Sequence, residues 1–188
     1  MTDELFINGI LQKGKEAKEK VQFEFTDISF QQLNWKPSRE SWSIAQCLNH
    51  LVVSDSSYFS VLKKITDGKY QMNFWEKYSP FTRVIGRLMK DQLQEQVKRK
   101  MKAPRIFLPA ASEINIGVLE RYYKNLDDFS GLISECRNID LDKTIITSPV
   151  VSFVTYSLRD AFQFLVQHEH RHINQAIRVK KNEKFPKQ

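Results

Sequence analysis

The sequence is poor in residues that interrupt regular structure: it has 6 glycines and 6 prolines among 188 residues. So few turn-forming residues argue against a fold of many short strands and favour long helices joined by few connections. The chain has only 2 cysteines, Cys47 and Cys136, each inside a helical pattern, which excludes a disulfide framework. We interpret both as small core residues with reduced thiols, and we expect a cytoplasmic protein.

Several signals of location and chemistry are also absent. No uncharged apolar run is long enough to cross a bilayer, and the polar N-terminus, Met1–Glu4, shows no signal-peptide pattern. We therefore expect no membrane partner. The chain contains no glycine-rich phosphate loop, no CxxC pair and no Ser/His/Asp nucleophile motif. The common sequence patterns for nucleotide binding, thiol redox chemistry and acyl transfer are thus missing.

The net charge of +7 raises the question of a nucleic-acid partner. The lysines are spread along most of the chain, and the densest basic stretches are residues 98–105 and 178–187. Neither stretch is interleaved with the aromatic residues on which single-stranded nucleic acids stack. We interpret both as solvated surface and do not expect nucleic acid as a partner.

The chain does have strong helical periodicity. Apolar residues recur at spacings of three and four in four long segments, each long enough for a bundle helix. The segments run from about Asp3 to about Phe25, from the N-cap Ser43 to Gly68, from Ser112 to Cys136, and from the N-cap Ser157 to Val179. We predict an all-α four-helix bundle that forms one domain over residues 1–188.

Two regions fit this pattern less well. Between Lys69 and Pro109 the periodicity is weak, and we expect Pro80 to start one or two shorter helices that run through Arg83 to Lys100. The stretch 144–156 is rich in β-branched and apolar residues, which is typical of a strand. We predict an extended loop there, because no second strand pattern is available to pair with it.

Histidines are the most informative residues. His168 and His172 lie one helical turn apart, at positions where the inward stripe of the last helix calls for apolar residues. Two inward imidazoles would each need a partner, and a shared divalent cation would satisfy both. His170 should face solvent. His50 lies off the centre of its helix's apolar face, so the pattern leaves it at a helix seam or, slightly more often, on the surface.

Two stretches resemble the DinB-like family, which is related to the YfiT-type metal hydrolases. They are Leu33–Leu51, which contains the run Asn34-Trp35-Lys36-Pro37, and the ending His168-x-x-x-His172-Ile173-Asn174-Gln175-Ala176. The resemblance implies an up-down-down-up four-helix bundle with a long, partly helical connection between its second and third helices. It also implies that His50, His168 and His172 bind one divalent metal, with the remaining positions open to water or substrate.

Other side chains could orient the histidines or a bound water. Gln46 and Ser54 lie one turn either side of His50, and Gln175 lies just beyond His172. Trp35 and Trp42 either wall the cavity or pack in the core. Imidazole ligands suit several metals, and the sequence does not distinguish zinc, nickel, iron, copper or manganese.

The resemblance suggests a metal-dependent enzyme acting on a small-molecule substrate. One activity that it implies is transfer of a low-molecular-weight thiol such as bacillithiol to an electrophile, and another is hydrolysis by water that the ion activates. The alternative is a non-catalytic metal-binding bundle or an interaction bundle with a role in stress. A homodimer fits either hypothesis, because such bundles commonly pair through a helix face.

Overall fold

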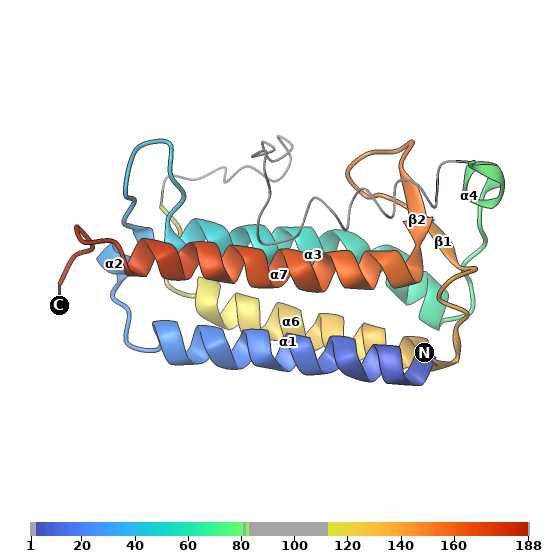
Figure 1. Ribbon diagram of the computed structural model, residues 1–188, viewed down its shortest axis with the longest axis horizontal. Helices are drawn as coiled ribbons and strands as arrows, with labels where there is room; N and C mark the ends of the chain where they lie inside the picture. Colours follow the sequence, from blue (N-terminus) through green and yellow to red (C-terminus); the bar gives the residue numbers. More distant parts are fainter. Residues whose placement is uncertain (1–2, 81, 83–112, 188) are drawn as a thin grey trace.

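Four long helices form an antiparallel bundle in the computed structural model, which describes residues 3–80, 82 and 113–187. They are α1 (Asp3–Phe25), α3 (Ile44–Thr66), α6 (Val118–Glu135) and α7 (Leu158–Lys180). Helices α1 and α7 run in one direction and α3 and α6 in the other (Figure 1). The predicted up-down-down-up bundle is therefore confirmed.

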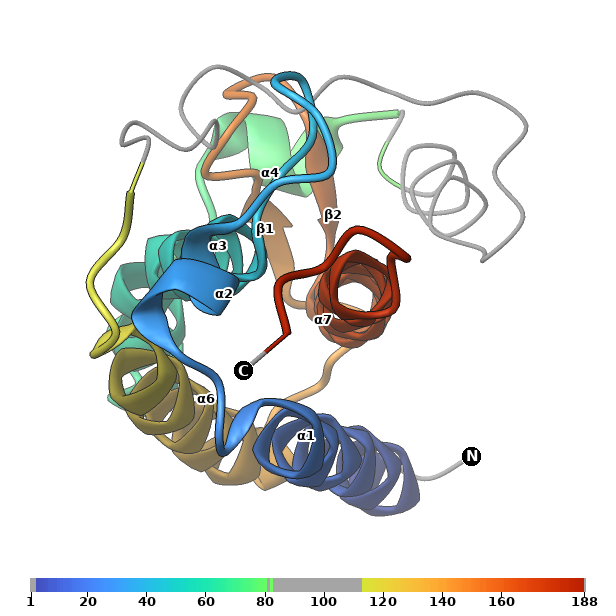
Figure 2. The ribbon, with the colours of Figure 1, turned by 90° about the vertical axis from the view of Figure 1, so that its left-hand side faces the viewer.

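The view along the bundle axis shows which helices are neighbours (Figure 2). Helix α3 packs against α6 and α7, and α1 packs against the same two helices from the opposite corner. Buried apolar side chains fill the space between the four helices in two clusters, one toward each end of the bundle. The seam between α3 and α7 lies under the loops of the upper face in this view.

Local sequence signals explain where the helices begin. The Ser43 hydroxyl accepts the backbone N–H of Gln46, whose side-chain oxygen accepts the N–H of Ser43, and this reciprocal cap starts α3. Helix α3 ends just before Gly68, which takes a positive φ of 67° that glycine adopts without strain. The Ser157 hydroxyl accepts the N–H of Asp160 and starts α7. Both predicted N-caps are confirmed.

Short elements join the long helices. They are α2 (Phe30–Asn34), α4 (Phe74–Tyr78), the 3-10 helix η2 (Cys136–Asn138), β1 (Ile145–Thr147) and β2 (Thr155–Ser157). The two strands pair antiparallel with Ile146 opposite Tyr156, so the prediction of an extended loop over 144–156 was wrong. The one β-branched stretch, together with Ser157 directly after it, supplies both strands and folds back on itself.

The start of the third long helix also differs from the prediction. Helix α6 begins at Val118 after Gly117 and not at Ser112. The side-chain oxygen of Asn115 accepts the N–H of Gly117 in a turn, and the helix begins only after this turn. The helices expected between Arg83 and Lys100 lie outside the described residues. Among the described helices, none is long and apolar enough to span a membrane.

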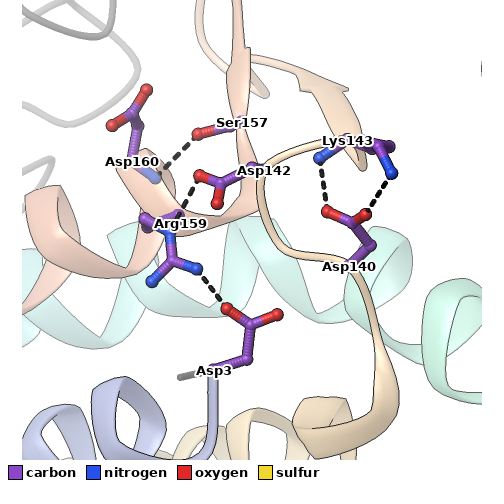
Figure 3. Close-up of polar contacts among 7 residues, drawn as sticks. All are labelled: Asp3, Asp140, Asp142, Lys143, Ser157, Arg159 and Asp160. Atoms are coloured by element: carbon purple, nitrogen blue, oxygen red, sulfur yellow. Dashed lines mark hydrogen bonds and ion pairs between the residues drawn. The ribbon is translucent and has the colours of Figure 1, made fainter. Parts of the chain in front are cut away.

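An ion-pair network fixes the end of the bundle where α7 begins (Figure 3). The Arg159 guanidinium donates to Asp142 through Nε at 2.8 Å and to Asp3 at the start of α1 through a second nitrogen. It also lies over the Phe6 ring, 4.5 Å from the centroid. This single side chain thus ties α7 to α1 and to the loop before β1.

We expect the Ser43→Ala variant to lose about 1 kcal/mol of unfolding free energy, because the first turn of α3 loses its side-chain acceptor. Urea denaturation would measure the loss. Ser41→Ala is the matched control, because the Ser41 hydroxyl shares a hydrogen bond with the Ser38 hydroxyl at the exposed surface and caps no helix of the described residues. Equal stability of the two variants would contradict a capping role for Ser43.

Candidate metal centre

Three histidines meet at the seam between α3 and α7. His50 lies in the second turn of α3, and His168 and His172 lie one turn apart on α7. Each offers one ring nitrogen, and these three atoms lie within 4.8 Å of one another. Nε2 of His50 is 3.0 Å from Nε2 of His168. The structure therefore brings together all three residues that the family resemblance implied as ligands.

The antiparallel packing of α3 and α7 causes this meeting. The start of α3 lies beside the end of α7, so the seventh residue of α3 can reach residues in the middle and second half of α7. His50 is 4% exposed, and the slight preference of its pattern for the surface was wrong. The helical pattern could not show that α7, which comes over a hundred residues later, covers this side of α3.

Two aromatic rings flank the histidines. Trp42, in the loop before α3, stacks on His172 with ring centroids 5.6 Å apart and meets His50 edge-on at 5.0 Å. Phe164, one turn before His168 on α7, stacks on that ring at 5.8 Å. These contacts restrict the orientation of the imidazoles and keep water from their faces.

The environment keeps the histidines on α7 uncharged. Burial, followed by the neighbouring His50 and Arg171, lowers the pKa of His172 to about 3. Burial also holds the pKa of His168 well below its usual range. Nδ1 of each ring is buried without a hydrogen-bond partner among the described residues. Neutral imidazoles with lone pairs to share are the form in which histidine binds a metal ion, so this donor set fits a divalent cation.

Comparison with known proteins agrees with this architecture. The family model of the DinB superfamily matches residues 15–176, which span the bundle and all three histidines. The chain belongs to the DinB superfamily. It is also similar to the uncharacterized protein YuaE of Bacillus subtilis (strain 168), with 25% identity over 166 residues that cover 88% of this chain and 93% of that protein. No solved structure matches the chain.

In this DinB-superfamily chain, the side chains that we expected to orient or surround the histidines make different contacts. Gln175 interacts with His172 and opposes the lowering of its pKa. The Gln46 side-chain oxygen accepts the N–H of Ser43, which gives Gln46 a part in capping α3. Ser54 is buried one turn after His50. Trp35 packs edge-on against Phe185 near the C-terminus.

His170 does not face open solvent as predicted. It is half-buried, and its pKa is lowered by burial and by the nearby Lys20, with smaller influences of Glu16 and Lys13. These three residues belong to α1, which packs along this side of α7. We had predicted that the side of α7 opposite the histidine pair is free surface, whereas α1 packs against it.

A buried acid pair lies in the core beside this site, and sequence reasoning missed its importance. Asp55 of α3 is 2% exposed and Glu169 of α7 is 4% exposed, and a hydrogen bond joins their carboxyl groups. Tyr122 of α6 donates to Oε1 of Glu169 at 2.5 Å. An acidic residue on an apolar stripe, as Asp55 is in the sequence, was the available signal.

Burial makes this pair hold a proton. It raises the pKa of Glu169 to about 7, while hydrogen bonds from Tyr122 and Asp55 oppose the rise. Burial, and then the charge of Glu169, raises the pKa of Asp55 well above its usual range. We infer that one carboxyl group is protonated at neutral pH and donates to the other, because two adjacent buried carboxylates would repel each other.

This proton has a measurable effect on stability. Below the ordinary glutamate pKa both the folded and unfolded states hold it, and between about pH 4.5 and pH 7 only the folded state does, so stability falls as the pH rises. In metal-free protein we expect Glu169→Gln to gain on the order of 2 kcal/mol relative to wild type across this range. Chemical denaturation at several pH values would measure it. Glu120→Gln, at an exposed site of α6, controls for loss of one negative charge. A pH-independent difference between Glu169→Gln and wild type would refute the shared proton.

Proposed function

We propose that this chain is a divalent-metal-dependent enzyme in which His50, His168 and His172 hold one ion and a small molecule takes an open coordination position. One observation carries the proposal: three ring nitrogens from two helices lie within 4.8 Å of one another. Three protein ligands with room for a further one are typical of catalytic metal sites, whereas structural zinc sites are closed by four.

The chain's own residues would hold the ion and shape its surroundings. The two helix backbones fix the spacing of the three imidazoles, and Trp42 and Phe164 support the rings from outside. Gln175 orients His172. Because His168 and His172 are neutral, neither needs to lose a proton to bind the ion.

The bound ion would act as a Lewis acid that stabilises the anionic form of a thiol or of water. Two reactions would use such an anion beside the three histidines. One is transfer of a low-molecular-weight thiol such as bacillithiol to an electrophile, and the other is hydrolysis. We propose thiol transfer or hydrolysis of a small molecule as the reaction class, and a homodimer as the assembly. Light scattering of the purified protein would give its mass.

We expect one divalent ion per chain in untagged protein, and none in His50→Ala or in the double variant His168→Ala/His172→Ala. Elemental analysis measures this directly and identifies the metal. His170→Ala is the matched control, since it lies on the same helix but faces α1 and should keep the full metal content.

Two results would contradict a three-histidine metal site. One is the absence of bound ion after incubation with zinc, nickel and manganese in turn. The other is loss of metal from His170→Ala to the same extent as from His50→Ala. Circular dichroism of each variant would exclude unfolding as the reason for a loss.

For catalysis, we expect the metal-loaded protein to accelerate either conjugation of a thiol to 1-chloro-2,4-dinitrobenzene or hydrolysis of a nitrophenyl ester. The rate should fall to background in His50→Ala and remain in His170→Ala, because His50 belongs to the cluster and His170 does not. Absorbance of the product measures both reactions. A protein that binds one ion but accelerates neither supports the alternative of a non-catalytic metal-binding bundle.

A further inference from the structure

Helix α7 carries a buried carboxyl group directly after the first of the two histidines that it contributes to the metal centre. Glu169 follows His168 in the chain, and one residue turns a helix by about 100°. The two side chains therefore meet different neighbours. Nε2 of His168 lies 3.0 Å from Nε2 of His50 on α3, whereas Glu169 lies in the core and is 4% exposed.

Hydrogen bonds join this carboxyl group to two other helices. The Tyr122 hydroxyl of α6 donates to Oε1 of Glu169 at 2.5 Å, and a further hydrogen bond links Glu169 to Asp55 of α3. Tyr122 is 1% exposed and Asp55 is 2% exposed, so water does not compete for these bonds. The three side chains, which we call the carboxyl clamp, thus hold α7 against both α3 and α6.

The carboxyl clamp acts on the part of α7 that carries the histidines. His168 precedes Glu169 and His172 follows it by three residues, so little more than one turn holds all three. The end of a helix side chain lies about 5 Å from the helix axis, so a rotation of about 10° moves it by about 1 Å. Ligand distances in a metal site vary by only about 0.2 Å. Apolar packing is not directional, whereas hydrogen bonds are, so the clamp can fix the rotation of α7 this closely.

We propose that Tyr122 and Glu169 are positioning residues of the metal centre. Through the carboxyl clamp they hold α7 at the rotation in which its two histidines reach the same ion as His50. The inference rests on the proposed function. It gives α6 a part in the site, although the three ligand atoms found among the described residues come from α3 and α7. Tyr122 and Glu169 offer the ion no atom in this cluster, so they act through the histidines.

Two substitutions of Glu169 separate positioning from stability. In Glu169→Gln the amide oxygen still accepts from Tyr122 and the amide nitrogen can donate to Asp55, so we expect the zinc affinity to stay close to that of wild type. In Glu169→Met an apolar side chain of similar length fills the same space without these bonds. Such a replacement is often neutral or stabilising, so the variant should fold. We expect its zinc affinity to fall about tenfold, the scale for loss of groups that orient metal ligands.

Tyr122→Phe removes only the hydroxyl donor of the carboxyl clamp, and its zinc affinity should fall severalfold. Tyr58→Phe is the matched control, because the Tyr58 hydroxyl is also buried and shares a 2.6 Å hydrogen bond, with the Tyr156 hydroxyl. It loses one buried hydrogen bond on α3 itself and should keep the zinc affinity of wild type. Competition with a chromophoric chelator measures the affinity, and urea denaturation of the metal-free protein measures the stability of each variant.

Cobalt(II) in place of zinc gives a readout that a purely structural role would not change. Its visible absorption bands depend on the number and geometry of the ligands. We expect the bands of Glu169→Gln and Tyr58→Phe to match those of wild type, and the bands of Glu169→Met and Tyr122→Phe to shift or weaken.

The outcomes separate the positioning role from the metal site itself. Wild-type zinc affinity and cobalt bands in Glu169→Met and Tyr122→Phe would overturn the positioning role and leave the metal site intact. An equal loss of zinc affinity in Tyr58→Phe, or in Glu169→Gln, would overturn the assignment to the hydrogen bonds of the carboxyl clamp. Wild-type protein that takes up neither zinc nor cobalt would overturn the proposed function, and this inference with it.

Discussion

The packing of α3 against α7 is the contact on which the site depends. It sets the start of one helix beside the end of the other, and this arrangement alone brings His50 to residues more than a hundred positions later in the chain. The same contact buries the imidazoles and thereby keeps those of α7 neutral. Burial of the imidazoles thus costs folding free energy, and it also leaves their nitrogen lone pairs available to a cation.

The interior of this bundle holds buried polar side chains along the same seam. Next to the histidines lies the hydrogen-bonded set of Asp55, Glu169 and Tyr122, which three different helices contribute. Replacing such groups with apolar residues of similar volume is often neutral or stabilising, so stability alone does not explain their presence. The ion-pair network around Arg159 at the other end of the bundle, and the apolar clusters between the helices, hold the frame in which these polar groups meet.

Helix positions could be predicted from the sequence because their causes are local. The apolar spacing of α1, the caps at Ser43 and Ser157 and the glycine at position 68 each act within a few residues. The β-hairpin was missed because both strands lie in one apolar stretch, and the start of α6 because a turn at Asn115 precedes it.

The parts of the site that could not be predicted depend on which helices are neighbours. Periodicity places His168 and His172 on the inward side of α7, but only the packing of α3 and α1 decides that His50 is buried and that His170 is half-buried. The pairing of Asp55 with Glu169 likewise depends on the packing of α3 against α7, which the sequence alone does not reveal. The family resemblance supplied the order of the histidines, and the structure supplies their convergence.

The most direct test of the central claim is X-ray absorption spectroscopy of the zinc-loaded protein. Three imidazole ligands should appear as nitrogen scatterers at about 2.0 Å with the outer-shell pattern of the ring, together with one or more light atoms from the open positions. Zinc surrounded by sulfur at about 2.3 Å, or by oxygen without imidazole, would show that the ion binds elsewhere. In that case the three histidines would form a buried polar cluster and not a metal centre.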